Sequence, residues 1–154
     1  MAEHILIDGY NVIHSLVDSK KTLAFGVNAS AQIFIQEASK LLSIVDRVTL
    51  VFDGNDVKST VDYPYRGRRF CVIYSDLNTT ADTLIEQMVR KSKARIDCTV
   101  VTNDHGLSNT VRALGGIIMS AKEFSSMISK DEYSYGKRTI AGDNGEPFGT
   151  KLFK

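Results

Sequence analysis

The chain has 154 residues, 43% of them hydrophobic and 24% charged, which suits one globular domain and argues against a disordered chain. Its formal net charge of +1 excludes a polybasic protein, so any surface for nucleic acid must come from local clustering. No apolar run reaches the roughly 18 residues of a membrane span, and the N-terminus lacks a signal-peptide pattern. We therefore expect a cytoplasmic protein with no membrane partner, and no pattern specifies an oligomeric state.

Strand and helix patterns alternate from the N-terminus onward. Residues 4–8 form a short apolar strand that ends at Asp8, and the Gly-Tyr-Asn sequence behind it is expected to turn. A helical pattern over about 29–44, with Ile33 among its apolar positions, precedes a β-branched strand at 47–53.

The middle of the chain contains the clearest helix. A polar segment at 54–67 leads to a third strand at 68–75, and a helix is predicted over 78–93. Thr79 and Asp82 at its start resemble a capping box, with Asp in place of the usual Glu or Gln.

The remaining elements repeat the alternation: a strand at 97–104, a helix at 105–116, a strand at 117–120 and a helix at 121–129. Alternating strands and helices predict βαβ units, hence an α/β fold whose central, mostly parallel sheet of about five strands is covered on both faces. We expect one domain over 1–130 and, over the glycine-containing 131–154, a C-terminal loop or partly disordered tail.

The cysteines and histidines form no metal-binding motif. Cys71 and Cys98 lie in apolar, β-like runs, and we expect both to be buried, reduced thiols. Together with three scattered histidines they lack the spacing of a zinc site.

Aspartates recur where the predicted strands end or the next helix begins. Asp8 and Asp53 end the first two strands, Asp82 lies in the first turn of a helix, and Asp104 ends the fourth strand. Because these positions share the carboxyl edge of a parallel sheet, we expect the four carboxylates to converge. Singly, each also has a local explanation: an Asp-Gly turn, a helix-dipole partner or an N-cap.

Four converging carboxylates repel one another unless a cation neutralises them. The hard cations Mg²⁺ and Mn²⁺ prefer oxygen ligands, and such sites catalyse phosphodiester hydrolysis. The sequence therefore predicts a divalent-metal site at this edge.

The segments "LIDGYNVIH", "LVFDG", "NTTADTLIEQMV" and "VVTNDHGL" resemble, in order and spacing, the NYN domain of the YacP-like family within the PIN-like nucleases. The resemblance implies a PIN-like three-layer α/β/α fold and metal-dependent cleavage of RNA. It makes Asp8 the central metal ligand, Asp82 and Asp104 its partners and Asp53 a fourth acidic member. Asn11 would orient Asp8 or a metal-bound water, and Thr102, with Asn103 beside it, would be a polar helper that contacts substrate.

The chain departs from the family pattern at Thr80, where similar members carry an acidic residue. Glu86 lies one turn after Asp82 on the same helix face, so it could approach the site or pair with Arg90. His14 and His105 flank the acidic edge, where a histidine could contact phosphate or simply lie on the surface.

A segment with the sequence "YPYRGRRF" is the predicted substrate contact. It combines Arg66, Arg68 and Arg69 with two tyrosines, which suits single-stranded RNA, although the arginines could instead pair with nearby acids. A second basic run, "RKSKAR" at 90–95, is expected at the helix end that points away from the carboxyl edge.

The sequence thus favours a Mg²⁺- or Mn²⁺-dependent endoribonuclease, with roles in mRNA decay or on ribosome-associated RNA as options and the ribosome as a possible second partner. The alternative is a PIN-like module that binds RNA or a ribonucleoprotein without efficient cleavage. An aspartyl phosphatase is disfavoured because Tyr10 stands where a second aspartate is usual.

Overall fold

The computed structural model describes residues 3–16 and 27–129. For residues 27–30 it describes the backbone alone. The predicted tail at 131–154 lies outside these residues. A six-stranded sheet forms the centre of the fold, in the order β3-β4-β2-β1-β5-β6. Its strands are β1 (His4–Asp8), β2 (Arg47–Phe52), β3 (Thr60–Asp62), β4 (Phe70–Tyr74), β5 (Cys98–Val101) and β6 (Ile117–Met119).

Five of the six strands run parallel, as predicted for βαβ units. The short strand β3 is the exception: it pairs antiparallel with β4 at one edge of the sheet. The sequence analysis treated this region as a polar loop, because all three residues of β3 are exposed and show no apolar alternation.

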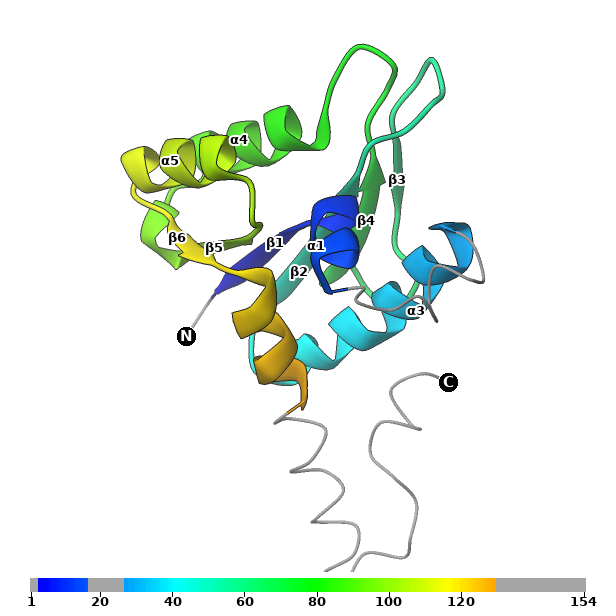
Figure 1. Ribbon diagram of the computed structural model, residues 1–154, viewed down its shortest axis with the longest axis horizontal. Helices are drawn as coiled ribbons and strands as arrows, with labels where there is room; N and C mark the ends of the chain where they lie inside the picture. Colours follow the sequence, from blue (N-terminus) through cyan, green and yellow to red (C-terminus); the bar gives the residue numbers. More distant parts are fainter. Residues whose placement is uncertain (1–2, 17–26, 130–154) are drawn as a thin grey trace, which may run out of the picture.

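Helices cover both faces of the sheet (Figure 1). One face packs against α1 (Gly9–Leu16), α3 (Val27–Ser39) and the helix of residues 121–129, through a core that includes Val12, Phe34 and Phe124. The other face packs against α4 (Ala81–Lys91) and α5 (His105–Leu114). The arrangement is the predicted three-layer α/β/α sandwich.

The alternation along β1 assigns its side chains to the two layers. Ile5 and Ile7 pack in the core on the α1 side, whereas Leu6 packs in the core on the α4 side. Asp8 has the same parity as Leu6, so its carboxylate faces the layer that contains α4 and α5. Burying apolar side chains on both faces of the sheet, each worth about 1.5–3 kcal/mol, fixes this register.

Three local expectations were wrong. The Gly-Tyr-Asn sequence does not form a loop turn but begins α1, which starts directly after β1. The N-cap of α4 is Thr80, not Thr79: Thr80 Oγ1 accepts a hydrogen bond from the N–H of Thr83. Ile33, which the helical pattern counted among the apolar positions of this helix, is 46% exposed on α3.

Both cysteines are buried, free thiols, as predicted. No helix among the described residues is long and apolar enough to cross a membrane.

Candidate active site at the carboxyl edge of the sheet

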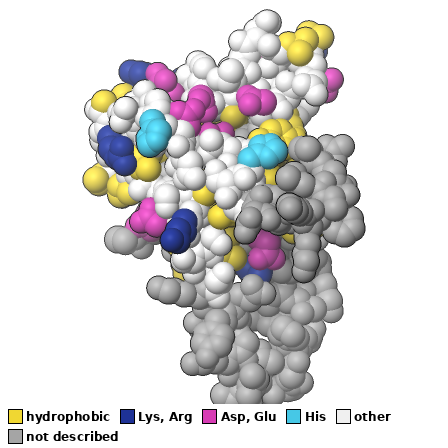
Figure 2. Space-filling view, viewed as in Figure 1, with side chains coloured by type: hydrophobic (Ala, Val, Ile, Leu, Met, Phe, Trp, Pro, Cys, Tyr) yellow, Lys and Arg dark blue, Asp and Glu magenta, His cyan; other side chains and the backbone are white. Residues whose placement is uncertain are grey.

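The ends of β1 and β5, together with the starts of α4 and α5, meet at one edge of the sheet. The strand order reverses at this point: β2 and β4 lie on one side of β1, whereas β5 and β6 lie on its other side. In open α/β sheets such a switch point is where ligands bind. Figure 2 shows acidic side chains gathered over this end of the sheet, with a histidine on either side.

Asp8 is the buried centre of the acidic group. It ends β1 and is only 6% exposed. The helix α1 begins at the next residue, Gly9. A Cβ at this position would lie 2.3 Å from the ring of Phe52. The close approach of α1 to β2 therefore requires glycine directly behind the aspartate.

Asp82 is the member of the acidic group that contacts both Asp8 and Asp104. It lies in the first turn of α4, in hydrogen-bond contact with Asp8 and Asp104. Partial burial and the charges of Asp8 and Asp104 raise the pKa of Asp82 to about 7. Burial also raises the pKa of Asp8, against the stabilising hydrogen bond from Thr102. The acidic group therefore retains a proton near neutral pH.

Asp104 combines two roles that the sequence analysis offered as alternatives. It is the N-cap of α5, and its Oδ1 accepts hydrogen bonds from the N–H groups of Gly106 at 2.7 Å and Leu107 at 3.2 Å. These bonds lower the pKa of Asp104, so its carboxylate is the charged member of the group. Its capping role does not remove it from the cluster, because it also contacts Asp82.

Asp53 lies at the rim. It is exposed, and its Oδ1 accepts a hydrogen bond from the N–H of Ala81 at 2.7 Å, so it fixes the start of α4 beside β2. Its charge contributes to the raised pKa of Asp8. Of the four predicted aspartates, three therefore contact one another and the fourth lies close by.

Thr102, rather than Asn11, directly orients Asp8. Its hydroxyl donates to Asp8 Oδ2 at 2.9 Å and accepts from the N–H of Asp104 at 3.1 Å. Asn11 acts one step further out: its Oδ1 accepts from the N–H of Asn103 at 2.9 Å. Because this N–H requires an oxygen, the amide nitrogen Nδ2 of Asn11 faces the other way.

Asn103 also has a structural role. Its Oδ1 accepts a hydrogen bond from the N–H of Ala121 at 3.0 Å, which ties the end of β5 to the helix of residues 121–129. Ser120 and Glu123 form a capping box at the same helix start, with reciprocal bonds of 2.8 and 3.1 Å. The sequence pattern S-x-x-E carried this signal, but the sequence analysis did not use it.

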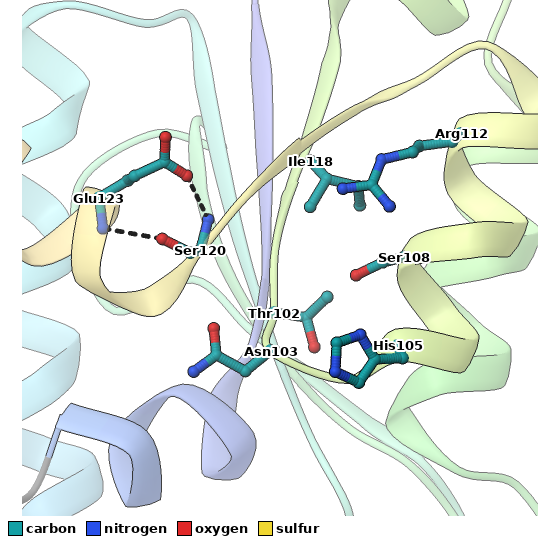
Figure 3. A pocket seen from close by; sticks show the side chains of 8 residues that line it. All are labelled: Thr102, Asn103, His105, Ser108, Arg112, Ile118, Ser120 and Glu123. Carbon is teal, nitrogen blue, oxygen red and sulfur yellow. Dashed lines mark hydrogen bonds between the residues drawn. The ribbon is translucent and has the colours of Figure 1, made fainter.

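Figure 3 shows a pocket of about 370 Å³ that Thr102 helps to line. Because Thr102 also donates to Asp8, the pocket adjoins the acidic group. His105, Ser108 and Arg112 line it from one face of α5, opposite Ser120 and Glu123. The guanidinium of Arg112 points into this space. Within the ranges that the structure describes, it makes no ion pair or hydrogen bond. The sequence analysis missed Arg112, although its i, i+7 spacing from His105 was visible.

The predicted arginines lie elsewhere. Arg66, Arg68 and Arg69 precede β4, and since β4 runs parallel to β1, its start lies at the opposite, amino edge of the sheet. The guanidinium of Arg69 donates to the backbone carbonyls of Leu42, Val45 and Asp46 at 2.7–2.9 Å. The structure therefore does not bring these arginines to the aspartates.

The sequence left two interpretations open for Glu86 and for the histidines His14 and His105. Glu86 pairs with Arg90 at 2.8 Å, which was one of the two expectations for it. His14 and His105 are both exposed.

The donor set determines which cation could bind here. Asp8, Asp82 and Asp104 offer only oxygen ligands, which suit Mg²⁺ or Mn²⁺ and not a thiolate-preferring metal. Within residues 3–16 and 27–129, no three His, Cys, Asp or Glu side chains are already arranged as a metal-binding group. A cation would therefore take few protein ligands and several waters, which is the usual state of Mg²⁺ in proteins.

Comparisons with known proteins follow this geometry. The model of the YacP-like NYN domain matches residues 5–147. Among solved structures, a mutant form of Rae1 (YacP) from Bacillus subtilis superposes with a TM-score of 0.75 at 21% identity, covering 98% of this chain and 90% of that one. A second structure of Rae1 (YacP) from the same organism gives a TM-score of 0.72 at 23% identity, covering 90% and 80%.

No curated protein matches the sequence. At these identities the two structures establish the shared fold, and the family model establishes the relationship over most of the sequence. The chain belongs to the family of YacP-like NYN domains.

Proposed function

We propose that this protein is a divalent-metal-dependent endoribonuclease that hydrolyses single-stranded RNA at the carboxyl edge of its sheet. Family membership is consistent with a nuclease-like, RNA-related function. One observation carries the proposal: the carboxylates of Asp8, Asp82 and Asp104 lie together at a ligand-binding position, where partial burial and the charges of Asp8 and Asp104 raise the pKa of Asp82 to about 7. Such an arrangement costs stability, and a bound cation removes that cost.

Asp8, Asp82 and Asp104 would hold Mg²⁺ or Mn²⁺. When bound, the cation would polarise the phosphodiester and lower the pKa of an attacking water. Asp53, at the rim, would add negative charge and keep the start of α4 in place through Ala81.

The other side chains would position these groups and the substrate. Thr102 fixes the rotamer of Asp8 through its hydroxyl. Asn11 and Asn103 hold the backbone that carries Thr102 and Asp104. The Nδ2 group of Asn11 would then donate to a substrate oxygen or an ordered water.

The pocket beside the acidic group offers the RNA a path. Arg112 would bind a phosphate next to the scissile one. The Ser108 hydroxyl donates to the Asp104 carbonyl at 2.8 Å, so its oxygen would accept a hydrogen bond from a ribose 2′-hydroxyl. This role takes the place of the one that the sequence analysis gave to Arg66, Arg68 and Arg69.

A cleavage assay tests the proposal. A mixed pool of single-stranded RNAs is incubated with Mn²⁺ or Mg²⁺, and the product ends are mapped. We expect the wild type to cut, and we expect Asp8→Asn and Asp82→Asn to lose about 100-fold or more of that activity. Asp56→Asn, which removes an exposed carboxylate outside the cluster, is the matched control and should cut normally.

The assay separates the two candidate functions. Equal cleavage by wild type and Asp8→Asn means that the site is wrong. RNA binding without any metal-dependent cleavage by the wild type favours the RNA-binding module instead.

A further inference from the structure

A second groove, of about 520 Å³, lies on the α4 side of the sheet toward its amino edge. Its floor contains Thr49, Cys71 and Ile73, which project from β2 and β4. The helices α4 and α5 pack over Leu6, Val51 and Val100, in β1, β2 and β5. The outer part of this face, toward β3 and β4, therefore forms an open groove.

Three cations border the groove: Arg47 from the start of β2, Lys91 at the end of α4, and Lys93 two residues further on. All three are exposed. Of the described residues that line the groove, none is acidic. Asp62 lies between Val61 and Tyr63, which both line the groove, so strand alternation points its carboxylate to the other side.

An aromatic side chain lies in the same groove. Tyr63 is 41% exposed, and the guanidinium carbon of Arg68 lies over its ring, 5.4 Å from the centroid. Two segments that are far apart in the sequence, "YPYRGRRF" and "RKSKAR", thus come together at the amino edge, away from the aspartates. Neither segment has a role in the site described above.

The combination of cations and an aromatic face identifies the class of ligand. Phosphates bind lysine and arginine along a groove, and bases stack on an exposed ring, which is how proteins hold single-stranded nucleic acid. An acidic peptide would use the cations but would gain little from the ring. His4 in this groove and Asp8 at the other edge are the two ends of β1, about 13 Å apart.

We propose that this amino-edge groove is a docking site for single-stranded RNA, separate from the acidic site. It binds the phosphate backbone through Arg47, Lys91 and Lys93 and stacks a base on Tyr63. RNA long enough to reach both edges is held by the groove while another part of the strand lies at the aspartates.

The test measures RNA binding in chelator, so that no cleavage is required. The probe is poly(U), titrated across a range of salt. Lys91→Gln combined with Lys93→Gln should weaken binding about tenfold at low salt and reduce the salt slope by about 1.4, since each phosphate contact on a single strand contributes about 0.7. Lys58→Gln combined with Lys122→Gln removes the same charge from exposed positions outside the groove and should leave binding nearly unchanged.

A second pair of variants tests the aromatic contact. Tyr63→Ala should weaken poly(U) binding about tenfold, whereas Tyr63→Phe keeps the ring and should bind like the wild type. Equal losses from both double variants would assign the effect to net charge and overturn the groove. Polyglutamate that displaces poly(U) as well as unlabelled poly(U) does would overturn RNA as its ligand.

The result is independent of the cleavage assay. If the wild type binds poly(U) through the groove but does not cut RNA, the proposed function is contradicted and the docking site is supported. If the wild type cuts RNA but Lys91→Gln combined with Lys93→Gln binds poly(U) normally, the docking site is contradicted and the proposed function stands.

Discussion

The hydroxyl of Thr102 lies between Asp8 and the backbone of Asp104, donating to the first at 2.9 Å and accepting from the second at 3.1 Å. Thr102 is 2% exposed, so no water replaces it easily. A single buried hydroxyl therefore couples the end of β1 to the start of α5.

Replacing Thr102 by valine keeps the shape of the side chain and removes this hydroxyl. We expect Thr102→Val to lower metal-dependent cleavage by about 10- to 100-fold, because Asp8 loses the group that orients it. We also expect a loss of about 1–2 kcal/mol in the free energy of unfolding. Thr102→Ser retains the hydroxyl and should retain most of the activity; if Ser and Val behave alike in steady-state kinetics, the hydroxyl is not the relevant group.

The raised pKa of Asp82 predicts how metal-free stability depends on pH. Between its ordinary pKa of 3.8 and about 7, the folded protein holds a proton that the unfolded chain releases, so stability falls as the pH rises through this range. Because Asp82 is only partly buried, we expect only about 1 kcal/mol from this effect. Urea unfolding at several pH values, in chelator, measures it.

Asp82→Asn provides the control, since its amide does not titrate and its stability curve should be flatter over the same range. Adding Mn²⁺ to the wild type should restore stability most strongly near pH 7, where the carboxylate is free to bind. If the wild type and Asp82→Asn have the same slope of stability against pH between pH 4 and pH 7, the raised pKa is contradicted.

Gly9 should tolerate no side chain while Phe52 is present. A Cβ at Gly9 would lie 2.3 Å from the Phe52 ring, which also packs against Tyr10 and Tyr74. We expect Gly9→Ala to cost about 1–3 kcal/mol of stability through overpacking. In a Phe52→Leu background the same substitution should cost less, and additive costs in this double-mutant cycle would rule out the clash as the cause.

Substitutions of Arg69 and Arg112 should have different effects, the first on stability and the second on substrate binding. Arg69→Ala removes three hydrogen bonds to backbone carbonyls and should lower the free energy of unfolding by about 1–2 kcal/mol without changing kcat. Arg112→Ala should leave stability unchanged and raise KM, because the lost phosphate contact is made equally in the ground and transition states.

Arg90→Ala is the matched control for Arg112. Arg90 is an exposed arginine on a different helix, α4, where it pairs with Glu86. A KM effect of the same size from Arg90→Ala would show that the contribution of Arg112 is general electrostatics.

The sequence predicted the parallel sheet because β1, β2 and β5 are nearly continuous apolar runs, the pattern of strands buried on both faces. It also predicted the gathering of the aspartates, since the carboxyl ends of parallel strands must share an edge. The helix α1 was missed because Gly9, Tyr10 and Asn11 have turn-like chemistry, and the buried positions Val12 and Ile13 are adjacent in a very short helix.

The arginines show what a linear reading leaves out. "YPYRGRRF" follows Asp53 closely in sequence, but β3 carries the chain back across the sheet before β4 begins. Proximity along the chain therefore gave the wrong edge, and only the pairing of β3 with β4 corrects it. Arg112 had the opposite problem, because a cation in the middle of a helix resembles any solvated residue until its neighbours are known.

The strand order has a consequence for synthesis of the protein. Asp8 and Asp53 are made early, but Asp82 and Asp104 come from the part of the chain that crosses back to build β5 on the far side of β1. A growing chain can pair β1, β2 and β4 and still lack half of its carboxylates. We therefore expect the acidic group to be complete only after α5 has left the exit tunnel and docked.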